Sequence, residues 1–597
     1  MPALPSSDDT QPPSSTAVPA WLRGIVRRRE SGLVIMAALC GAIAGIAVFV
    51  ISRSAQIAHE LFFGLKAGDR LSGMESLPAA LVLAVPVLGG LALGLFNLVL
   101  ARSHARRPVD PIEANALHGG RMSLGGSLIV GAQTLISNAC GASVGLEAAY
   151  SQLGSGFAAR FGLAFRLRRA DMRLMVGCGS AGAIAAAFGA PLTGAFYAFE
   201  IIIGSYAVGT LAPVAAAAIT GTIVTHVLGL EPYQFAVGAA FQPHASGVAT
   251  LCGLGLFCAG SAIAIMQGVA LSETLFRRIR LPIGFMPAIG GLLLGLLALV
   301  TPQVLSSGHG ALMKLLAEPP QPLLLLGGLI LLKAFASAIS LGSGFRGGLF
   351  FASLFLGALL GQFFLAGVSL VTLSPGLAPH AAALAGMAAL AAAIVGGPLT
   401  MSFLVLEMTG DFQLTVAVLM AVIVATITVR ETFGYSFATW RFHLRGEAIR
   451  SAHDVGWARD LTVARVMRTP VPTVERTMSL GAFRHAHALG STHYVVAVDG
   501  PDGPYAGLVR VADAYQVNFE GQAGGLVDGL LTHRTDTLSP SMTLKDAARR
   551  IEACEAEALA VVDARKRVVG LLSEAHALRR YAEEADRARR DLAGEGV

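Results

Sequence analysis

The stretch Ala185–Thr193, with the sequence AAAFGAPLT, recurs in the second half of the chain as Ala392–Thr400, with the sequence AAIVGGPLT. A glutamate follows nine residues after the proline of each copy, Glu200 in the first and Glu407 in the second. Chance similarity between two Ala/Gly-rich helices is a poor explanation for a shared Gly-x-Pro-Leu-Thr motif with a matching glutamate. The repeat therefore predicts a membrane protein built from two related halves of inverted topology.

The composition around the repeat excludes an ordinary soluble enzyme and a disordered scaffold. Of 597 residues, 54% are hydrophobic and 14% are charged, and the mean hydropathy is +0.64, whereas soluble proteins have roughly 25% charged residues. The 70 glycines indicate closely packed, interrupted membrane helices. The net charge of +6 comes from basic residues near the two ends of the chain, which indicates cytoplasmic flanks and no nucleic-acid partner. The six cysteines have no metal-ligand spacing, so no metal site is predicted.

Apolar runs predict several membrane-spanning helices. The first, Leu33–Ile51, follows four arginines, which places the N-terminus in the cytoplasm. Other runs long enough to span are 81–100, 206–228, 248–267, 323–341 and 414–429.

Shorter segments bounded by glycine or proline alternate with these runs. They are Gly145–Gly156, Pro191–Phe199 and Gly347–Leu360. Because a bilayer core of about 30 Å needs about 20 helical residues, these segments are predicted to be broken or re-entrant helices. Such helices are tolerated where they line a polar pathway, and in transporter folds they mark the ion site.

The chain is expected to have six parts. Two similar α/β units follow the membrane part, with predicted strands at 494–498 and 507–509 in the first unit and at 558–563 and 570–573 in the second. The predicted parts are a disordered tail (1–20), a membrane domain (21–442), a linker (443–460), the two α/β units (461–520 and 521–583) and a charged tail (584–597).

Glu147 stands in the apolar stretch Gly141–Ala149, with the sequence GASVGLEAA. A helix that starts here presents unpaired N–H groups and a positive dipole end, and both attract an anion. An ionised carboxylate at this point occupies the place of the anion, and a protonated one leaves it. An ionisable group in a membrane segment favours a functional role, although neighbouring N–H groups that simply satisfy a buried glutamate are the alternative.

The membrane part, over about residues 30–440, resembles the CLC family of chloride channels and chloride/proton exchangers. The resemblance rests on several sequence motifs that occur in the same order as in this family. The C-terminal units resemble a pair of CBS domains, over about residues 460–583. The resemblance implies an all-α polytopic membrane domain, with an inverted repeat and broken helices, followed by an α/β cytoplasmic CBS pair.

GASVGLEAA resembles the Gly-Arg/Lys-Glu-Gly-Pro segment of this family. Leu146 takes the basic position, and Ala148 and Ala149 replace Gly-Pro. The resemblance makes Glu147 the gating and proton-coupling glutamate, and it assigns Gly145 and Leu146 to the anion-binding segment.

Two further motifs complete the implied anion site. Gly342–Phe350, GSGFRGGLF, resembles the Gly-x-Phe-x-Pro segment of the family and implies that Leu349 and Phe350 offer backbone N–H groups to the central anion. Within it, Arg346 either attracts anions at a vestibule or pairs with a neighbour. Tyr435 resembles the tyrosine that points its hydroxyl group at the anion, and its alternative role is that of an interfacial anchor.

Two positions depart from the family pattern. Pro108, in RPVDP, stands where the family has a serine that donates to the central anion. Proline there resembles the nitrate-preferring plant branch, so nitrate is the alternative to chloride. Ile201 stands where exchangers have an inner proton glutamate. The sequence is therefore compatible both with a passive channel and with a proton-coupled exchanger.

In the CBS pair, Asp513 ends a GLVRVAD pattern suited to ribose hydroxyl groups. The second copy has Ser573, but it has His576 in place of the aspartate. These residues predict either an adenine-nucleotide site or a purely structural, dimerising role.

The sequence thus predicts a homodimeric anion transporter, not an enzyme, in a bacterial inner membrane with both termini in the cytoplasm. Its partners are inorganic anions, chloride first, and membrane lipid, and it requires no cofactor. A CBS-linked divalent-cation transporter would need clustered acidic residues, whereas Glu147, Glu200 and Glu407 are isolated. A membrane enzyme would need a His/Asp/Glu constellation, and none is evident.

Overall fold

The computed structural model divides the chain into two compact units, residues 1–454 and 455–597, which are considered separately. The predicted N-terminal tail and its following arginines fall almost entirely outside the described residues, as do most of the predicted linker and of the C-terminal tail. The structure describes residues 19, 30–103, 107–230, 245–278, 283–371, 376–444, 461–501, 503–516, 525–577, 579–580 and 583–584.

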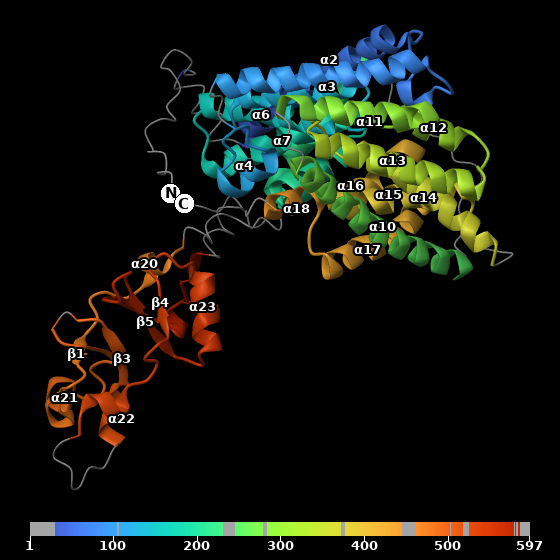
Figure 1. Ribbon diagram of the computed structural model, residues 1–597. Coiled ribbons are helices and arrows are strands. Elements are labelled where there is room, and N and C mark those ends of the chain that lie inside the picture. The colour runs from blue at the N-terminus through green and yellow to red at the C-terminus, as the bar shows by residue number, and fades with distance from the viewer. Residues whose placement is uncertain are drawn as a thin grey trace. The chain divides into compact units, whose positions relative to one another are not determined.

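The first unit is helical (Figure 1), and the order of its described helices forms two series that repeat one another. The first series is α2 (Glu30–Phe63), α3 (Ala79–Arg102), α4 (Pro111–Leu117), α5 (Leu124–Ala139), α6 (Glu147–Ala164), α7 (Arg169–Phe188), α8 (Pro191–Tyr197) with the π-helical turn η3 (Ala198–Ile203), and α9 (Val208–Val227). The second series is α10 (Ala245–Arg278), α11 (Met286–Val300), α12 (His309–Ala317), α13 (Leu323–Ser343), α14 (Phe350–Ser369), α15 (Pro379–Val395), α16 (Pro398–Thr409) and α17 (Phe412–Thr432), and α18 (Phe437–Leu444) follows. Short 3-10 turns are η2 (Leu71–Gly73), η4 (Ile283–Phe285) and η5 (Pro302–Val304).

The two series pack in the same way. Helix α2 packs on α9 as α10 packs on α17, and α6 packs on α7 as α14 packs on α15. The helices α3 and α11 pack against each other across the two series, and so do α8 and α16. The predicted duplication is therefore confirmed in the helix order and in the packing.

The repeated sequence marks the same turn in both halves. Helices α7 and α15 end at Gly189 and Gly396, whose φ angles of +65° and +90° lie in the left-handed region. Glycine reaches this region without a steric penalty and is the usual residue after a helix. Pro191 and Pro398 then begin α8 and α16, where the missing N–H of proline removes no helical hydrogen bond.

Glu200, on the π-helical turn of the first half, caps the start of α16 in the second half. Its carboxylate accepts hydrogen bonds from the backbone N–H groups of Leu399 (3.0 Å) and Thr400 (2.9 Å) and from the Thr400 hydroxyl group (2.7 Å). These N–H groups belong to the first helical turn, which has no carbonyl partners within its own helix.

Glu407, on α16, caps the start of α8 in return. Its carboxylate accepts from the backbone N–H groups of Leu192 (2.7 Å) and Thr193 (2.8 Å) and from the Thr193 hydroxyl group (2.6 Å). A negative charge at a helix N-terminus is also favoured by the helix dipole. The two glutamates of the repeat therefore join the halves by reciprocal caps.

Among the described residues, seven helices are long and apolar enough to cross a membrane: α2, α3, α9, α10, α13, α14, and α17 together with α18. The predicted short segment at 347–360 is wrong, because α14 has 20 residues and is one of the seven. The segment at 145–156 also continues, as the 18-residue helix α6. The glycines in α14 do not end the helix but allow close packing, since a Cβ at Gly357 would collide with the backbone of Gly386 in α15.

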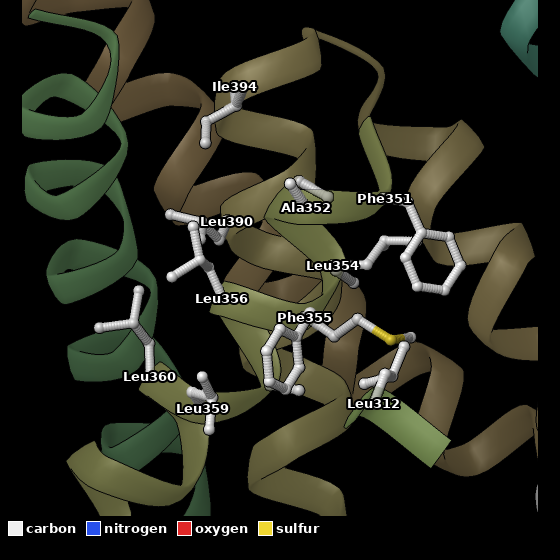
Figure 2. Packing of buried hydrophobic residues seen from close by; sticks show 14 of the residues in the cluster. Leu312, Phe351, Ala352, Leu354, Phe355, Leu356, Leu359, Leu360, Leu390 and Ile394 are labelled. Carbon is white, nitrogen blue, oxygen red and sulfur yellow. The ribbon is translucent and has the colours of Figure 1, made fainter. Parts of the chain in front are cut away.

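The N-terminal half of α14 lies in the main apolar core of the unit. Phe351, Leu354 and Leu356 of α14 share this core with Leu390 and Ile394 of α15 (Figure 2). The burial fixes the position of α14, and with it the position of the α14 N-terminus.

The second unit holds two three-stranded sheets of the same topology. In each sheet the first strand pairs with the second in parallel, and the second pairs with the third antiparallel, with a register shift near its end. The α/β character predicted for this unit is thus confirmed. The strands are β1 (Thr473–Glu475), β2 (Tyr494–Val498), β3 (Tyr505–Arg510), β4 (Thr537–Leu538), β5 (Ala558–Val562) and β6 (Val568–Ser573), and the helices are α20 (Val463–Val466), α21 (Leu480–Ala486), α22 (Val511–Gln516) and α23 (Leu544–Ala553), with the turn η6 (Val527–Leu530).

Replacing Glu407 by alanine is expected to destabilise the protein. The change leaves two backbone N–H groups and the Thr193 hydroxyl group without their carboxylate, and hydrogen bonds to a charged acceptor contribute about 1.5–3 kcal/mol each. Thermal unfolding of the purified full chain in detergent should show a lower midpoint for Glu407→Ala and for Glu200→Ala. The control Glu431→Ala, at an exposed site near the end of α17, should unfold like the wild type. Equal midpoints in all four proteins would contradict the capping role.

Candidate functional site

The chain segments that lead into α6 and α14 pair with each other. Both leave their preceding helices through glycines of positive φ, Gly141 (+86°) and Gly344 (+103°). They then meet at an antiparallel bridge in which the Gly145 N–H donates to the Gly348 carbonyl at 2.9 Å and the Gly348 N–H donates to the Gly145 carbonyl at 3.3 Å. The antiparallel direction is the one that an inverted repeat requires.

Serine hydroxyl groups hold both segments in a reciprocal arrangement. Ser340 Oγ of α13 accepts from the N–H of Ser143 at 3.0 Å, and Ser137 Oγ of α5 accepts from the N–H of Arg346 at 2.9 Å. A third contact joins the Ser143 and Ser337 hydroxyl groups at 3.0 Å. The helix starts of the two halves are therefore fixed next to each other.

Glu147 begins α6 at this junction and is 4% exposed. Its carboxylate lies near its own backbone N–H and near the N–H of Phe351 in the first turn of α14. Its Oε2 atom has no hydrogen-bond partner among the described residues. The carboxylate folds back over Gly145, where a Cβ would collide with Oε2. A negative group thus occupies a place to which two helix N-termini point, and such a place favours an anion.

Glu147 lines two cavities. The first, which we call the Pro108 cavity, has a volume of 440 Å³ and is also lined by Leu349 and Phe350. The second, which we call the His59 cavity, has a volume of 480 Å³ and is also lined by Leu146. The structure therefore brings the predicted residues of the two helix starts together around one carboxylate.

Tyr435 lies apart from this group. It lines a third cavity of 540 Å³, and its hydroxyl group is 3.2 Å from Nδ1 of His443. Ile201 lines both this cavity and the Pro108 cavity, so an apolar side chain stands where the two adjoin. Tyr435 and the two helix starts therefore line different cavities, and the role of Tyr435 at the central anion stays a prediction.

Tyr197 is the tyrosine that lines the Pro108 cavity, and the sequence analysis missed it. Its ring packs near Phe350, and Ser151 lies within hydrogen-bonding reach of its hydroxyl group. The internal repeat held the signal, because Tyr197 corresponds to Leu404 in the second copy. Tyr197 is thus a polar aromatic side chain in only one of the two matched apolar helices.

Charges of both signs line the Pro108 cavity, because the carboxylates of Asp110, Glu113 and Glu147 line it together with three arginines. The arginines are Arg107, Arg346 and Arg441. Nη2 of Arg441 lies 3.3 Å from the carboxylate of Glu273, so part of the positive charge is balanced by an ion pair.

In the second unit, the predicted nucleotide residues lie at the ends of corresponding strands. Asp513 is on α22, directly after β3, and Ser573 ends β6. The hydroxyl group of Tyr494 donates to Glu557 Oε2 at 2.5 Å and links the two copies. Burial and the neighbouring Glu557 raise the pKa of Tyr494 to about 12, so its hydroxyl group stays protonated at neutral pH.

The fold and the site define a polytopic membrane protein whose two halves meet at a buried carboxylate between two helix N-termini. The chain belongs to the voltage gated chloride channel family, whose sequence model matches residues 89–430. The CBS domain model matches residues 527–583.

Curated relatives agree with this membership. The chain is 31% identical over 407 residues to the voltage-gated ClC-type chloride channel ClcB of Salmonella typhimurium, covering 66% of this chain and 95% of the relative. It is 34% identical over 374 residues to a putative chloride channel protein ClcB-like of Ralstonia nicotianae, covering 60% of this chain and 84% of the relative.

Solved structures support the fold. A slow cyanobacterial Cl⁻/H⁺ antiporter matches with a TM-score of 0.61 and 19% identity, covering 69% of this chain and 97% of the antiporter. A eukaryotic CLC transporter matches with a TM-score of 0.58 and 17% identity, covering 93% of this chain and 99% of the transporter.

Replacing Gly145 by alanine is expected to displace the Glu147 carboxylate without unfolding the protein. The added Cβ meets the flexible end of a side chain, and the backbone at Gly145 is not in the left-handed region. A crystal or cryo-EM structure of Gly145→Ala should show the carboxylate turned away from the N–H of Phe351. A carboxylate in its original place would contradict the assigned packing.

Proposed function

We propose that this protein transports chloride across a membrane by a CLC-type mechanism in which Glu147 is the gate. The observation that carries the proposal is the position of one buried carboxylate between two cavities, at a junction of two helix N-termini. Membership of the voltage gated chloride channel family supports the same conclusion.

In the proposed mechanism, the ionised carboxylate of Glu147 competes with the anion for the N–H groups of the helix starts. Protonation removes its charge, so the carboxyl group leaves and an anion takes its place. Backbone dipoles suit this task, because they replace part of the hydration shell without trapping the anion as a full positive charge would. The bound anion then moves between the Pro108 cavity and the His59 cavity.

This mechanism is compatible both with a passive channel and with a proton-coupled exchanger. Ile201 gives no carboxylate for proton entry from the Pro108 cavity, which favours uncoupled conduction. The solved antiporters with the same fold share under 25% identity with this chain and therefore speak for the fold alone.

The Pro108 cavity is assigned to the cytoplasmic side. Helix α18 contributes Arg441 and Phe442 to it, and the chain continues from α18 toward the CBS unit. Basic residues before the first apolar run favour a cytoplasmic N-terminus as well. We assign the protein to a bacterial inner membrane as a homodimer, and exposed apolar side chains on α9, such as Val208, suit contact with lipid or with a second copy.

Nothing in the site favours a divalent-cation transporter. Glu200 and Glu407, the carboxylates that such a protein would need to gather, are each bound to a separate helix start. For the CBS unit, adenine-nucleotide binding at Asp513 and Ser573 stays a prediction, with a purely structural role as its alternative.

Replacing Glu147 by glutamine should fix the gate in its protonated form. Because protonation frees the site, chloride flux of the wild type should rise as the pH falls, whereas flux through Glu147→Gln should be independent of pH. Any chloride-driven proton movement should be lost in the variant. Chloride efflux from proteoliposomes, recorded with chloride and pH electrodes from about pH 4.5 to about pH 7.5, measures both quantities.

The control Glu431→Gln should behave like the wild type in these measurements. Unchanged pH dependence in Glu147→Gln would remove Glu147 from the mechanism. Absence of chloride flux from the wild type would overturn the proposed function itself.

Nitrate should compete well with chloride in the wild type, and replacing Pro108 by serine should move anion preference further toward chloride. The new hydroxyl group adds a directed donor to the Pro108 cavity, and a small spherical anion uses such a donor better than a broad planar one. A hydrogen bond to a charged group is worth about 1.5 kcal/mol, and nitrate keeps part of this gain, so the chloride-to-nitrate flux ratio should rise by a few-fold to about tenfold. Flux ratios that are equal in the two proteins would contradict a selectivity role for Pro108.

A further inference from the structure

Tyr197 begins a chain of four hydroxyl groups that lies between α6, α7 and α8. Ser151 is within hydrogen-bonding reach of the Tyr197 hydroxyl group. The hydroxyl groups of Ser151 and Ser180 are 2.9 Å apart, and those of Ser180 and Ser155 are 2.6 Å apart. The chain ends where the Ser155 hydroxyl group donates to the backbone carbonyl of Val176 at 3.0 Å. The three serines are at most 4% exposed, and the Tyr197 end of the chain lines the Pro108 cavity.

The carbonyl group at the far end gives this chain one direction. A carbonyl oxygen can only accept, so the proton of Ser155 points to Val176, and the Ser155 oxygen accepts from Ser180. Because each hydroxyl group has one proton, Ser180 in turn accepts from Ser151, and Ser151 accepts from Tyr197. The Tyr197 proton is thus committed to the chain. Its oxygen presents lone pairs to the Pro108 cavity, where it can accept a hydrogen bond and has no proton to donate.

The hydroxyl chain accompanies the half of the membrane unit that carries Glu147. In the other half, the matching positions follow from the helix start at Phe350 and from the internal repeat. These positions carry apolar residues, which are Leu354, Ala358, Met387 and Leu404. A buried hydroxyl group requires a hydrogen-bond partner, and the four groups of the chain supply one another with partners up to the Val176 carbonyl.

Glu147 stands one helical turn from the Tyr197 end of the chain. Glu147 and Ser151 are positions i and i+4 of α6, so their side chains share one face of this helix. Glu147 and Asp110 are the acidic groups that act on the Tyr197 hydroxyl group. In the structure the Glu147 carboxylate folds back over Gly145. A carboxyl group that leaves this place toward the Pro108 cavity therefore meets the Tyr197 oxygen one turn along α6.

We propose that the Tyr197 oxygen is the docking place of the protonated gate, where the carboxyl O–H of Glu147 donates to Tyr197 while an anion occupies the place that the carboxylate has left. This inference rests on the proposed transport function. An ionised carboxylate has no proton to donate to the Tyr197 oxygen, so Tyr197 stabilises the protonated form alone. Tyr197 is thereby a positioning residue that sets the pH at which the gate opens, and it is not a ligand of the anion.

Other titratable and charged groups face Glu147 from both cavities. On the side of the Pro108 cavity they are Arg107, Asp110, Glu113, Arg346 and Arg441. On the side of the His59 cavity they are Arg53, His59, Arg70 and His309. All of these groups are retained in a Tyr197→Phe protein, which loses one oxygen atom and keeps the aromatic ring. A change in the pH profile of this variant therefore reports on the Tyr197 hydroxyl group.

Chloride efflux from proteoliposomes that hold the full-length protein, recorded at a series of pH values and chloride concentrations, tests the docking place. In Tyr197→Phe the pH of half-maximal flux should fall by about half a unit to one unit, which is the effect of one neutral hydrogen bond on a proton equilibrium. The shift is downward because the protonated carboxyl group loses its acceptor, so a higher proton concentration is needed to reach this form. The apparent KM for chloride should equal that of the wild type.

Tyr515→Phe is the matched control. It makes the same chemical change at an exposed tyrosine of the second unit and should keep the pH profile of the wild type. A cryo-EM structure of Glu147→Gln gives a second, independent measurement. Because the glutamine amide is a permanent donor, its side chain should lie within hydrogen-bonding distance of the Tyr197 oxygen.

Three results would overturn the inference while the wild type still transports chloride. The first is a pH profile of Tyr197→Phe equal to that of Tyr515→Phe. The second is a raised KM for chloride at an unchanged pH of half-maximal flux, which would make Tyr197 a ligand of the anion. The third is a Glu147→Gln side chain that points into the His59 cavity. A wild type that transports no chloride would instead contradict the proposed function, so the two failures are distinguishable.

Discussion

The backbone N–H groups at the start of a buried helix have no hydrogen-bond partner within that helix, and in an apolar layer no water is present to act as the partner. This constraint governs the membrane unit. The N–H groups that begin α16 bind Glu200 from the other half, and those that begin α8 bind Glu407 in return. Ser137 and Ser340 exchange hydrogen bonds across the halves in the same reciprocal way. Each half therefore depends on its counterpart for the polar groups that its helix starts require.

At the junction of α6 and α14, the proposed transport site, this exchange is incomplete among the described residues. The bridge between Gly145 and Gly348 brings the starts of α6 and α14 together, and the ligand that they receive is a side chain that can be protonated. Whereas Glu200 and Glu407 are each held by three hydrogen bonds, Glu147 keeps Oε2 without a partner among the described residues. A weakly held carboxylate can be replaced by an anion, and a strongly held one stabilises the fold.

Glycine makes both arrangements possible, for two different physical reasons. At Gly145 the absence of a Cβ leaves room for the Glu147 carboxylate, so the residue belongs to the site. At Gly357 the absence of a Cβ lets α14 approach the backbone of α15, so the residue belongs to the packing. The same residue type suggested a helix break in the sequence, and only its neighbours in space distinguish the two roles.

The sequence by itself determined the membrane class, the duplication and the α/β character of the C-terminal unit, because hydropathy and repeated motifs are local properties. It also marked Glu147 as a candidate site residue, because this carboxylate is isolated in an apolar stretch. The tertiary structure alone decided that Glu200 and Glu407 are caps and that Tyr197 and not Tyr435 lines the Pro108 cavity. Each of these facts joins residues that are far apart along the chain. A sequence motif indicates that a helix start needs hydrogen-bond acceptors for its backbone N–H groups. The packing of the two halves decides which distant side chain supplies these acceptors.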